Sequence, residues 1–129
     1  MKKILITDDD PNMLEIISMA FETTGGSYEI LTASDGRKAM EMVKSHHPDL
    51  LILDLMMPNG HGYWVCREIR SDKSFDTMPI LVLSAKYYPK DREEVLAMGA
   101  NAFMTKPFAL RQIVERSRTL MNEPSDISG

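Results

Sequence analysis

The sequence predicts a doubly wound α/β domain, in which helices cover both faces of a five-stranded parallel sheet. Short apolar segments alternate five times with segments whose apolar residues recur at helical spacing. Residues 50–53 and 80–83 are apolar at every position, which is typical of strands buried on both faces. The 129 residues fit one domain of ordinary size, so we expect a single layered unit.

The first two strands flank the first helix. Residues 3–7 are the first predicted strand, and residues 28–32 are the second. The helix between them begins after Pro11, and Gly25-Gly26 stops it. Its predicted inner face carries Met13, Ile16, Ile17, Ala20 and Phe21.

The central strand separates the second and third helices. Ser34 or Asp35 is placed to cap the second helix, and Pro48 ends it. Residues 50–53 are the third strand, and residues 60–70 form the third helix. The inner faces of these two helices carry Ala39, Met42, Val43, Val65, Cys66 and Ile69.

The remaining two strand–helix units complete the pattern. Residues 79–83 are the fourth strand and residues 101–105 the fifth. Pro89 opens the fourth helix, Gly99 closes it at the C′ position, and Pro107 starts the last helix. The predicted inner face of the last helix carries Leu110, Ile113, Val114, Ser117 and Leu120.

Helices that connect parallel strands make right-handed crossovers, which restricts the topology. The usual arrangement for five strands is the flavodoxin-like order 2-1-3-4-5, whose switch point lies between the first and third strands. Ligands bind at the carboxyl ends of those strands, so we expect the functional site there.

Composition and charge exclude several classes of protein. The chain is 43% apolar and 26% charged, which supplies a core and argues against disorder. The net charge is −4 and Lys and Arg form no dense block, so we expect no direct contact with nucleic acid or with a membrane surface. The apolar runs reach four residues, whereas a membrane-spanning helix needs roughly 20.

The single cysteine and the amino-terminal sequence favour a cytoplasmic protein. Cys66 has no second cysteine with which to form an internal disulfide, and the first residues lack the features of a signal peptide. We expect residues 1–121 to form the domain. Residues 122–129 lack hydrophobic periodicity, and we expect them to be a tail or the start of a linker.

Carboxylates follow two strands that the topology places side by side. Asp8, Asp9 and Asp10 come after the first strand, and Asp54 follows the third. Two carboxylates at ~4 Å repel by about 4 kcal/mol at an effective dielectric constant near 20, so we expect a cation to hold them together. Mg²⁺, or Mn²⁺ in its place, suits these oxygen ligands. The alternative is that the aspartates cap the helix after Pro11, a role that we assign to Asp10.

Ser84 and Lys106 follow the fourth and fifth strands. Either residue alone is weak evidence of a site, because serines are common in turns and lysines are usually solvated. Beside an acidic cluster, however, a hydroxyl donor and an ammonium group suit the oxygens of a transferred phosphoryl group. The four strand ends together therefore predict a phosphoryl-transfer site.

The strand ends also carry four short motifs. These are residues 4–11 (ILITDDDP), 51–58 (LILDLMMP), 82–85 (VLSA) and 106–108 (KPF). With them the chain resembles the receiver domains of bacterial two-component response regulators, over about residues 2–121. The resemblance implies a signalling domain, rather than an enzyme, that catalyses only its own phosphorylation and dephosphorylation.

The resemblance assigns roles to the residues at the strand ends. It implies that Asp54 accepts a phosphoryl group from a sensor histidine kinase or a phosphotransfer protein. Asp8 and Asp9 hold Mg²⁺ together with Asp54, and the backbone carbonyl of Met56 completes the protein ligands. Ser84 and Lys106 contact the phosphoryl group, and the Lys106–Pro107 peptide bond is cis.

The resemblance also implies a switch. Phosphorylation draws Ser84 and Lys106 inward, and Phe103 on the fifth strand rotates inward with them. Met56 and Lys86 border the phosphoryl group and affect its lifetime. The surface formed by the fourth helix, fifth strand and fifth helix then binds a downstream partner, an output domain or a second copy of the chain.

Two other functions stay open on the sequence. A small Mg²⁺-dependent phosphatase of the haloacid dehalogenase type also uses an aspartyl phosphate, but that family expects an acid two residues after the nucleophile, where this chain has Met56. A docking module that works without phosphate is the other alternative, and the intact set of acids argues against it.

Overall fold

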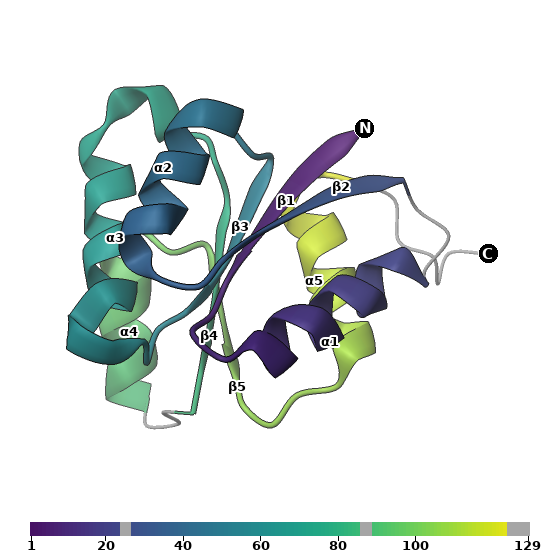
Figure 1. Ribbon diagram of the computed structural model, residues 1–129. Helices are drawn as coiled ribbons and strands as arrows, with labels where there is room; N and C mark the ends of the chain where they lie inside the picture. The colour runs from purple at the N-terminus through teal and green to yellow at the C-terminus, as the bar shows by residue number, and fades with distance from the viewer. Residues whose placement is uncertain (24–26, 86–88, 124–129) are drawn as a thin grey trace.

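The computed structural model of the chain describes residues 1–23, 27–85 and 89–123, and it confirms the doubly wound α/β architecture (Figure 1). Strands and helices alternate as predicted, and their bounds are β1 (Lys2–Thr7), α1 (Pro11–Glu22), β2 (Tyr28–Ala33), α2 (Gly36–His46), β3 (Leu50–Asp54), α3 (His61–Ser71), β4 (Ile80–Ser84), α4 (Pro89–Ala97), β5 (Ala102–Thr105) and α5 (Leu110–Leu120). Two short 3-10 helices, η1 (Pro58–Gly60) and η2 (Lys73–Phe75), flank α3. None of the described helices is long and apolar enough to cross a membrane.

The five strands form one parallel sheet in the predicted order β2-β1-β3-β4-β5. Every residue of the central strand β3 and of its neighbour β4 is buried, as their apolar sequences predict. Thr7 of β1 lies beside Leu53 of β3, and Asp54 lies beside Leu83 of β4. Because the strands are parallel, the residues that follow them meet at one edge of the sheet, which we call the carboxyl edge.

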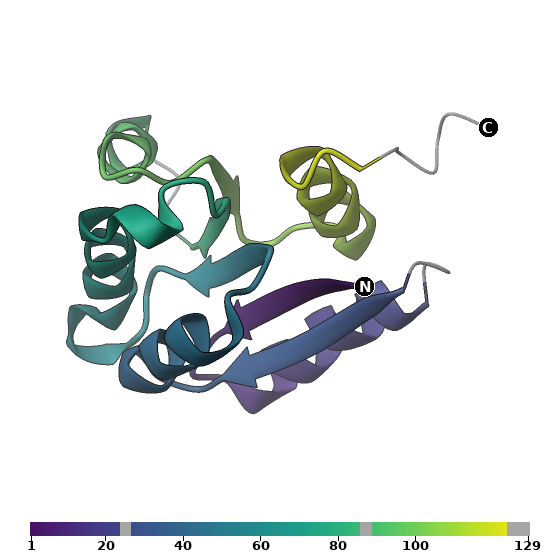
Figure 2. The ribbon, with the colours of Figure 1, turned by 90° about the horizontal axis from the view of Figure 1, so that it is seen from above.

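Helices cover the two faces of the sheet unequally. Figure 2 shows α2, α3 and α4 on one face and α1 and α5 on the other. Alternate residues of each strand supply the two core layers: Leu5 and Phe103 belong to the α2/α3/α4 layer, whereas Ile4 and Ile52 belong to the α1/α5 layer. Successive side chains of a strand point to opposite faces of the sheet, so the position of a residue in its strand decides which helices it packs against.

The opposite, amino edge of the sheet holds the start of β1 and the end of α5. Lys2 and Met121 line one groove there. The Tyr28 hydroxyl, at the start of β2, lies 2.9 Å from Oε1 of Glu123 and accepts a hydrogen bond of 3.0 Å from Nε of Arg118. Side-chain hydrogen bonds thus connect the end of α5 to the amino edge of the sheet.

Local sequence signals set the starts of α1 and α2 and the end of α4 as predicted. Asp10 caps α1 by accepting the Asn12 N–H at 2.9 Å, and Asp35 caps α2 by accepting the Lys38 N–H at 2.8 Å. Gly99 follows α4 with φ of 107°, the left-handed conformation expected of a C′ glycine. Three predicted features lie outside the described residues: the Gly25-Gly26 stop, Lys86, and the tail beyond residue 123.

The predicted start of the last helix is wrong. α5 begins at Leu110 rather than at Pro107, because the preceding segment stays extended and packs Phe108 against the α1/α5 layer. Ala109 is the extended N-cap residue, with φ −83° and ψ 133°. The Lys106–Pro107 peptide bond is cis, as the resemblance implies.

Two predicted core positions are also wrong. Ile16 is 43% exposed and Leu110 is 37% exposed. Neighbouring helix residues lie about 100° apart, so Ile17, which is fully buried, turns Ile16 away from the core. Leu110 is the first residue of its helix and lies near the carboxyl edge, where the core ends.

Candidate functional site

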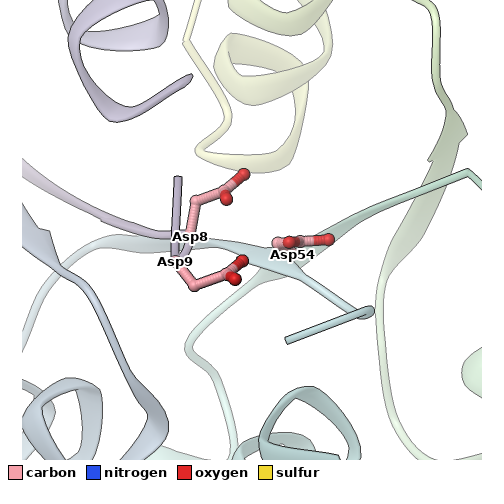
Figure 3. A group of neighbouring side chains, drawn as sticks. All are labelled: Asp8, Asp9 and Asp54. Carbon is pink, nitrogen blue, oxygen red and sulfur yellow. The ribbon is translucent and has the colours of Figure 1, made fainter. Parts of the chain in front are cut away.

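Three carboxylates converge at the carboxyl edge, where the sequence predicts the site. Asp8 and Asp9 follow β1, and Asp54 is the last residue of β3 (Figure 3). One carboxylate oxygen from each lies within 4.8 Å of the others, and within the described ranges this is the one such group of three or more possible metal ligands. Asp8 and Asp54 are buried, whereas Asp9 is exposed.

Lys106 lies between the two buried carboxylates. Its Nζ is 3.5 Å from Oδ2 of Asp8 and 3.5 Å from Oδ1 of Asp54, and its side chain is 24% exposed. The ammonium group therefore partly balances two negative charges and still faces solvent. Backbone hydrogen bonds fix its position, because the Lys106 N–H donates to the Ser84 carbonyl at 2.7 Å.

Burial leaves the Asp8 carboxylate incompletely compensated. Loss of solvation raises its pKa, and the negative charges of Asp54 and Asp9 raise it further. A hydrogen bond from the Asp10 N–H at 2.9 Å and the charge of Lys106 act in the opposite direction. The ionised form of Asp8 is thus held in place at a net cost, which a bound cation would offset.

Two further predicted residues lie at the same edge. Ser84 ends β4 and is fully buried beside the end of β3. Met56 lies two residues after Asp54, and its N–H donates to Oδ1 of Asp54 at 3.1 Å. One acceptor oxygen of the Asp54 carboxylate is therefore oriented by the backbone that follows it.

Comparison with known proteins places this geometry in a family. The profile of the response regulator receiver domain matches residues 4–118, which include every residue of the carboxyl-edge cluster. The chain belongs to the receiver domain family of two-component response regulators. Its resemblance to that family, based on the four motifs, is confirmed.

Curated relatives of this receiver are longer regulatory proteins. The alkaline phosphatase synthesis transcriptional regulatory protein PhoP of Bacillus subtilis is 37% identical over 120 residues, which are 93% of this chain and 48% of PhoP. The response regulator MprA of Mycobacterium avium is 40% identical over 126 residues, which are 96% of this chain and 54% of MprA. The receiver thus spans about half the length of the curated relatives it matches.

Solved structures agree with the fold. The receiver domain of the Francisella response regulator 1452 has a TM-score of 0.86 and 27% identity, and the match covers 95% of this chain and 98% of that one. The Vibrio cholerae chemotaxis protein CheY4 has a TM-score of 0.85 and 28% identity, with coverage of 93% and 98%. The flavodoxin-like topology predicted from the sequence is confirmed.

The cluster of the receiver suits a hard divalent cation. Oδ2 of Asp8 is buried, and beyond its ionic contact with Lys106 at 3.5 Å it has no hydrogen-bond partner within the part of the chain that the structure describes. Carboxylate oxygens are the preferred protein ligands of Mg²⁺. The chemistry and convergence of Asp8, Asp9 and Asp54 therefore fit a metal ion of this kind.

The structure describes Phe103 and Met56, two of the residues to which the resemblance assigns the switch or the lifetime of the phosphoryl group. Phe103 is 7% exposed and faces the α2/α3/α4 layer from β5, opposite Val82 of β4. The Met56 side chain is 50% exposed at the carboxyl edge. Lys86, two residues after Ser84, lies outside the described residues.

An apolar groove beside Lys106 was not predicted from the sequence. It has a volume of about 450 Å³ and lies between α1 and the segment before α5. Its lining residues are Met13, Ile16, Lys106, Pro107, Phe108 and Leu110. The sequence does not mark this groove, because the helical periodicity of α1 fits Ile16 on the inner face as well as Ile17.

Proposed function

We propose that this receiver is a phosphorylation-controlled switch in which Asp54 accepts a phosphoryl group from a sensor histidine kinase or a phosphotransfer protein. The observation that carries the proposal is the position of Lys106, 3.5 Å from both Asp8 and Asp54 in a cluster of three carboxylates. A nucleophilic carboxylate, a cation site and an ammonium group at one point are what phosphoryl transfer requires.

The residues divide the chemistry as follows. Asp8, Asp9 and Asp54, with the backbone carbonyl of Met56, would hold Mg²⁺, or Mn²⁺ in its place. The metal ion, when bound, reduces the repulsion between the incoming phosphoryl oxygens and the carboxylates. An Asp54 oxygen attacks phosphorus, the bond from phosphorus to the donor nitrogen breaks, and its electron pair returns to the donor imidazole.

Two other residues stabilise the group after transfer. Lys106 places a positive charge beside Asp54, and Ser84 brings a hydroxyl to the same edge. The new phosphoryl group adds about −1.5 to −2 charge and three acceptor oxygens. We expect Ser84 and Lys106 to follow these oxygens, with Phe103 adjusting its packing, and Met56 and Lys86 to influence how long the group survives.

The phosphodonor approaches over the apolar groove. This groove contains Lys106 in its wall, so a partner seated there reaches the Asp54 cluster. Ile16 and Leu110 on its rim are exposed apolar side chains that a partner would cover. We assign the α4–β5–α5 surface to a downstream partner, an output domain or a second copy of the chain. Because kinases of this class work in the cytoplasm, we place the receiver there.

Intact-mass measurement after incubation with a small phosphodonor tests the proposal. The wild type should gain one phosphoryl group with Mg²⁺ and none with chelator. Asp54→Asn should gain none under either condition, whereas Asp76→Asn, an exposed acid distant in sequence, should behave as the wild type. Residues 1–121 should suffice as the phosphorylated unit, with residues 122–129 as tail or linker.

Contrary results would favour the alternatives. An adduct on Asp54→Asn would refute the assignment of the acceptor. Absence of an adduct on the wild type with Mg²⁺ would favour a docking module that needs no phosphate, and repeated turnover of a phosphate ester would favour a phosphatase.

A further inference from the structure

Thr7, the last residue of β1, carries a buried hydroxyl. The residue is 1% exposed, and within the described residues its Oγ1 has no hydrogen-bond partner. Its neighbours across the sheet are Ala33 of β2 and Leu53 of β3, which are both apolar. A buried hydroxyl without a hydrogen bond costs free energy that a methyl group of the same size does not cost. Packing of β1 alone therefore does not account for a threonine at this position.

The side chain of Thr7 lies on the same side of the sheet as that of Asp9. Leu5 of β1 packs into the α2/α3/α4 layer, whereas Ile6 belongs to the α1/α5 layer. Thr7 comes two residues after Leu5, so the alternation of the strand turns it toward the α2/α3/α4 layer. Figure 3 shows the side chains of Asp8 and Asp9 leaving the end of β1 on opposite sides. The Thr7 hydroxyl thus lies on the Asp9 side of the carboxylate cluster, deeper in the protein.

The three carboxylates of the cluster are held unequally. Asp8 accepts a hydrogen bond from the Asp10 N–H. Asp54 accepts one from the backbone N–H two residues later, and Lys106 forms an ion pair with both Asp8 and Asp54. The Asp9 carboxylate is exposed, and no residue in the described ranges gives it a hydrogen bond or an ion pair.

A carboxylate that binds a metal ion is usually held in orientation by a further hydrogen bond. Asp9 lacks such a bond from the described part of the chain, and the hydroxyl of Thr7 lacks an acceptor. Buried water molecules in proteins typically bond to polar groups that are otherwise unsatisfied, and a bridging water is nearly as favourable as a direct hydrogen bond. The two unsatisfied groups are therefore complementary, one as donor and the other as acceptor.

We propose that Thr7 is the positioning residue of Asp9. Its hydroxyl donates to a water molecule, which donates in turn to the Asp9 carboxylate and keeps that carboxylate turned toward Asp8 and Asp54. A carboxylate that is already oriented loses less conformational freedom when it binds a cation, so the contact strengthens Mg²⁺ binding. The inference rests on the proposed function, because it concerns the same cation site.

Thermal unfolding at increasing Mg²⁺ concentration, without a phosphodonor, measures this effect. A ligand that binds the folded state raises Tm according to the ratio of its concentration to its Kd, so the series gives the Kd for Mg²⁺. Thr7→Val replaces the hydroxyl by a methyl group of similar size, and it should bind Mg²⁺ about tenfold more weakly than the wild type.

Thr7→Ser separates the hydroxyl from the packing of the side chain. It keeps the hydroxyl and should bind Mg²⁺ within about twofold of the wild type, because the contact with Asp9 is retained. It also loses a buried methyl group, so it should have a lower Tm than the wild type when no metal ion is present. Stability and Mg²⁺ affinity should therefore change independently in the two variants.

Ser117→Ala is the matched control. Ser117 on α5 is also fully buried, and within the described residues its Oγ likewise has no hydrogen-bond partner. It belongs to the half of α5 that runs toward the amino edge, away from the carboxylates. Removal of its hydroxyl should leave the Kd for Mg²⁺ unchanged.

A second measurement needs no metal ion. The three-bond NMR coupling between the amide nitrogen and the carboxyl carbon of Asp9 reports the rotamer of its side chain. In the metal-free wild type the coupling should indicate one dominant rotamer, and in Thr7→Val it should indicate averaging over several.

Three results would overturn the role of Thr7. These are Mg²⁺ binding by Thr7→Val as tight as that of the wild type, equal weakening in Thr7→Ser, which would assign the effect to packing, and equal weakening in Ser117→Ala. Failure of the wild type itself to bind Mg²⁺ would instead refute the cation site of the proposed function. The coupling then decides on Thr7: averaging at Asp9 in the variant alone would support the contact, and equal averaging in both proteins would refute it.

Discussion

Neutralising Asp8 should stabilise the protein when no metal ion is present. Asp8→Asn keeps an oxygen that can accept the Asp10 N–H and removes one buried negative charge. The carboxylate oxygens of Asp8 and Asp54 lie within 4.8 Å of each other, so at an effective dielectric constant of about 20 their repulsion is at least about 3.5 kcal/mol. The repulsion from Asp9 is smaller, because Asp9 is exposed.

Two attractions oppose these terms: the hydrogen bond from the Asp10 N–H, which the variant can keep, and the charge of Lys106. Lys106, at 3.5 Å, attracts the Asp8 carboxylate by about 4.7 kcal/mol on the same scale, and its partial exposure reduces this value. Burial of the carboxylate adds a desolvation penalty of several kcal/mol, so the unfavourable terms prevail, as the raised pKa of Asp8 indicates. We expect Asp8→Asn to be more stable than the wild type by about 1–2 kcal/mol, or roughly 4–10 °C in melting temperature.

Thermal and urea unfolding in chelator would measure this difference, with Asp76→Asn as the control at an exposed acid.

The stability difference between the wild type and Asp8→Asn should depend on pH with a definite sign. The folded wild type binds a proton at Asp8 more tightly than the unfolded chain, whose pKa is near 3.8. Its stability relative to the variant should therefore rise as pH falls through the raised pKa, and the difference should close near pH 3.8.

Saturating Mg²⁺ should reverse the order at neutral pH. A ligand that binds only the folded state at 100 times its Kd adds about 2.7 kcal/mol, and the variant lacks one ligand carboxylate. A variant that is less stable than the wild type in chelator would refute the reasoning, because it would mean that Lys106 more than compensates the buried charge. A stability difference that does not change with pH would refute the assignment to Asp8.

Two further substitutions test other parts of the structure. Gly62→Ala places a Cβ against the Leu55 carbonyl, so it should destabilise the fold by about 1–3 kcal/mol and slow phosphorylation of the adjacent Asp54. Urea unfolding measures the first effect and the rate of phosphoryl uptake the second. A variant with wild-type values in both assays would contradict the predicted collision. Tyr28→Phe removes the hydroxyl that accepts a hydrogen bond from Nε of the buried Arg118. This should lower the free energy of unfolding in urea by about 1–2 kcal/mol without changing phosphoryl uptake, and an unchanged urea midpoint would argue against a role of that hydrogen bond.

The strands could be predicted because their signals are local. Residues 50–53 and 80–83 are apolar at every position, and only burial on both faces of a sheet accounts for that pattern. The parallel topology then places the residues after each strand at one edge, so the sequence alone predicts that Asp8, Asp54 and Lys106 lie together.

Other features depend on packing that the sequence does not display. Periodicity alone could not separate Ile16 from Ile17, because both fit an amphipathic helix until the position of the sheet is known. Proline at a helix start is common, but Phe108 packs into the core from an extended segment and delays α5 to Leu110. The Arg70 side chain donates to carbonyls in the loop before β4 and in the turn after α4, and no sequence motif marks these contacts.

The start of β1 and the end of α5 lie opposite the site, which bears on how the domain can be joined to others. Lys2 and Met121 lie at the amino edge, the length of a strand away from Asp54. A reporter protein fused at either end would therefore leave the carboxyl edge open to a phosphodonor. The domain is therefore suited to a biosensor, because a reporter protein attached at the amino edge does not block access to Asp54.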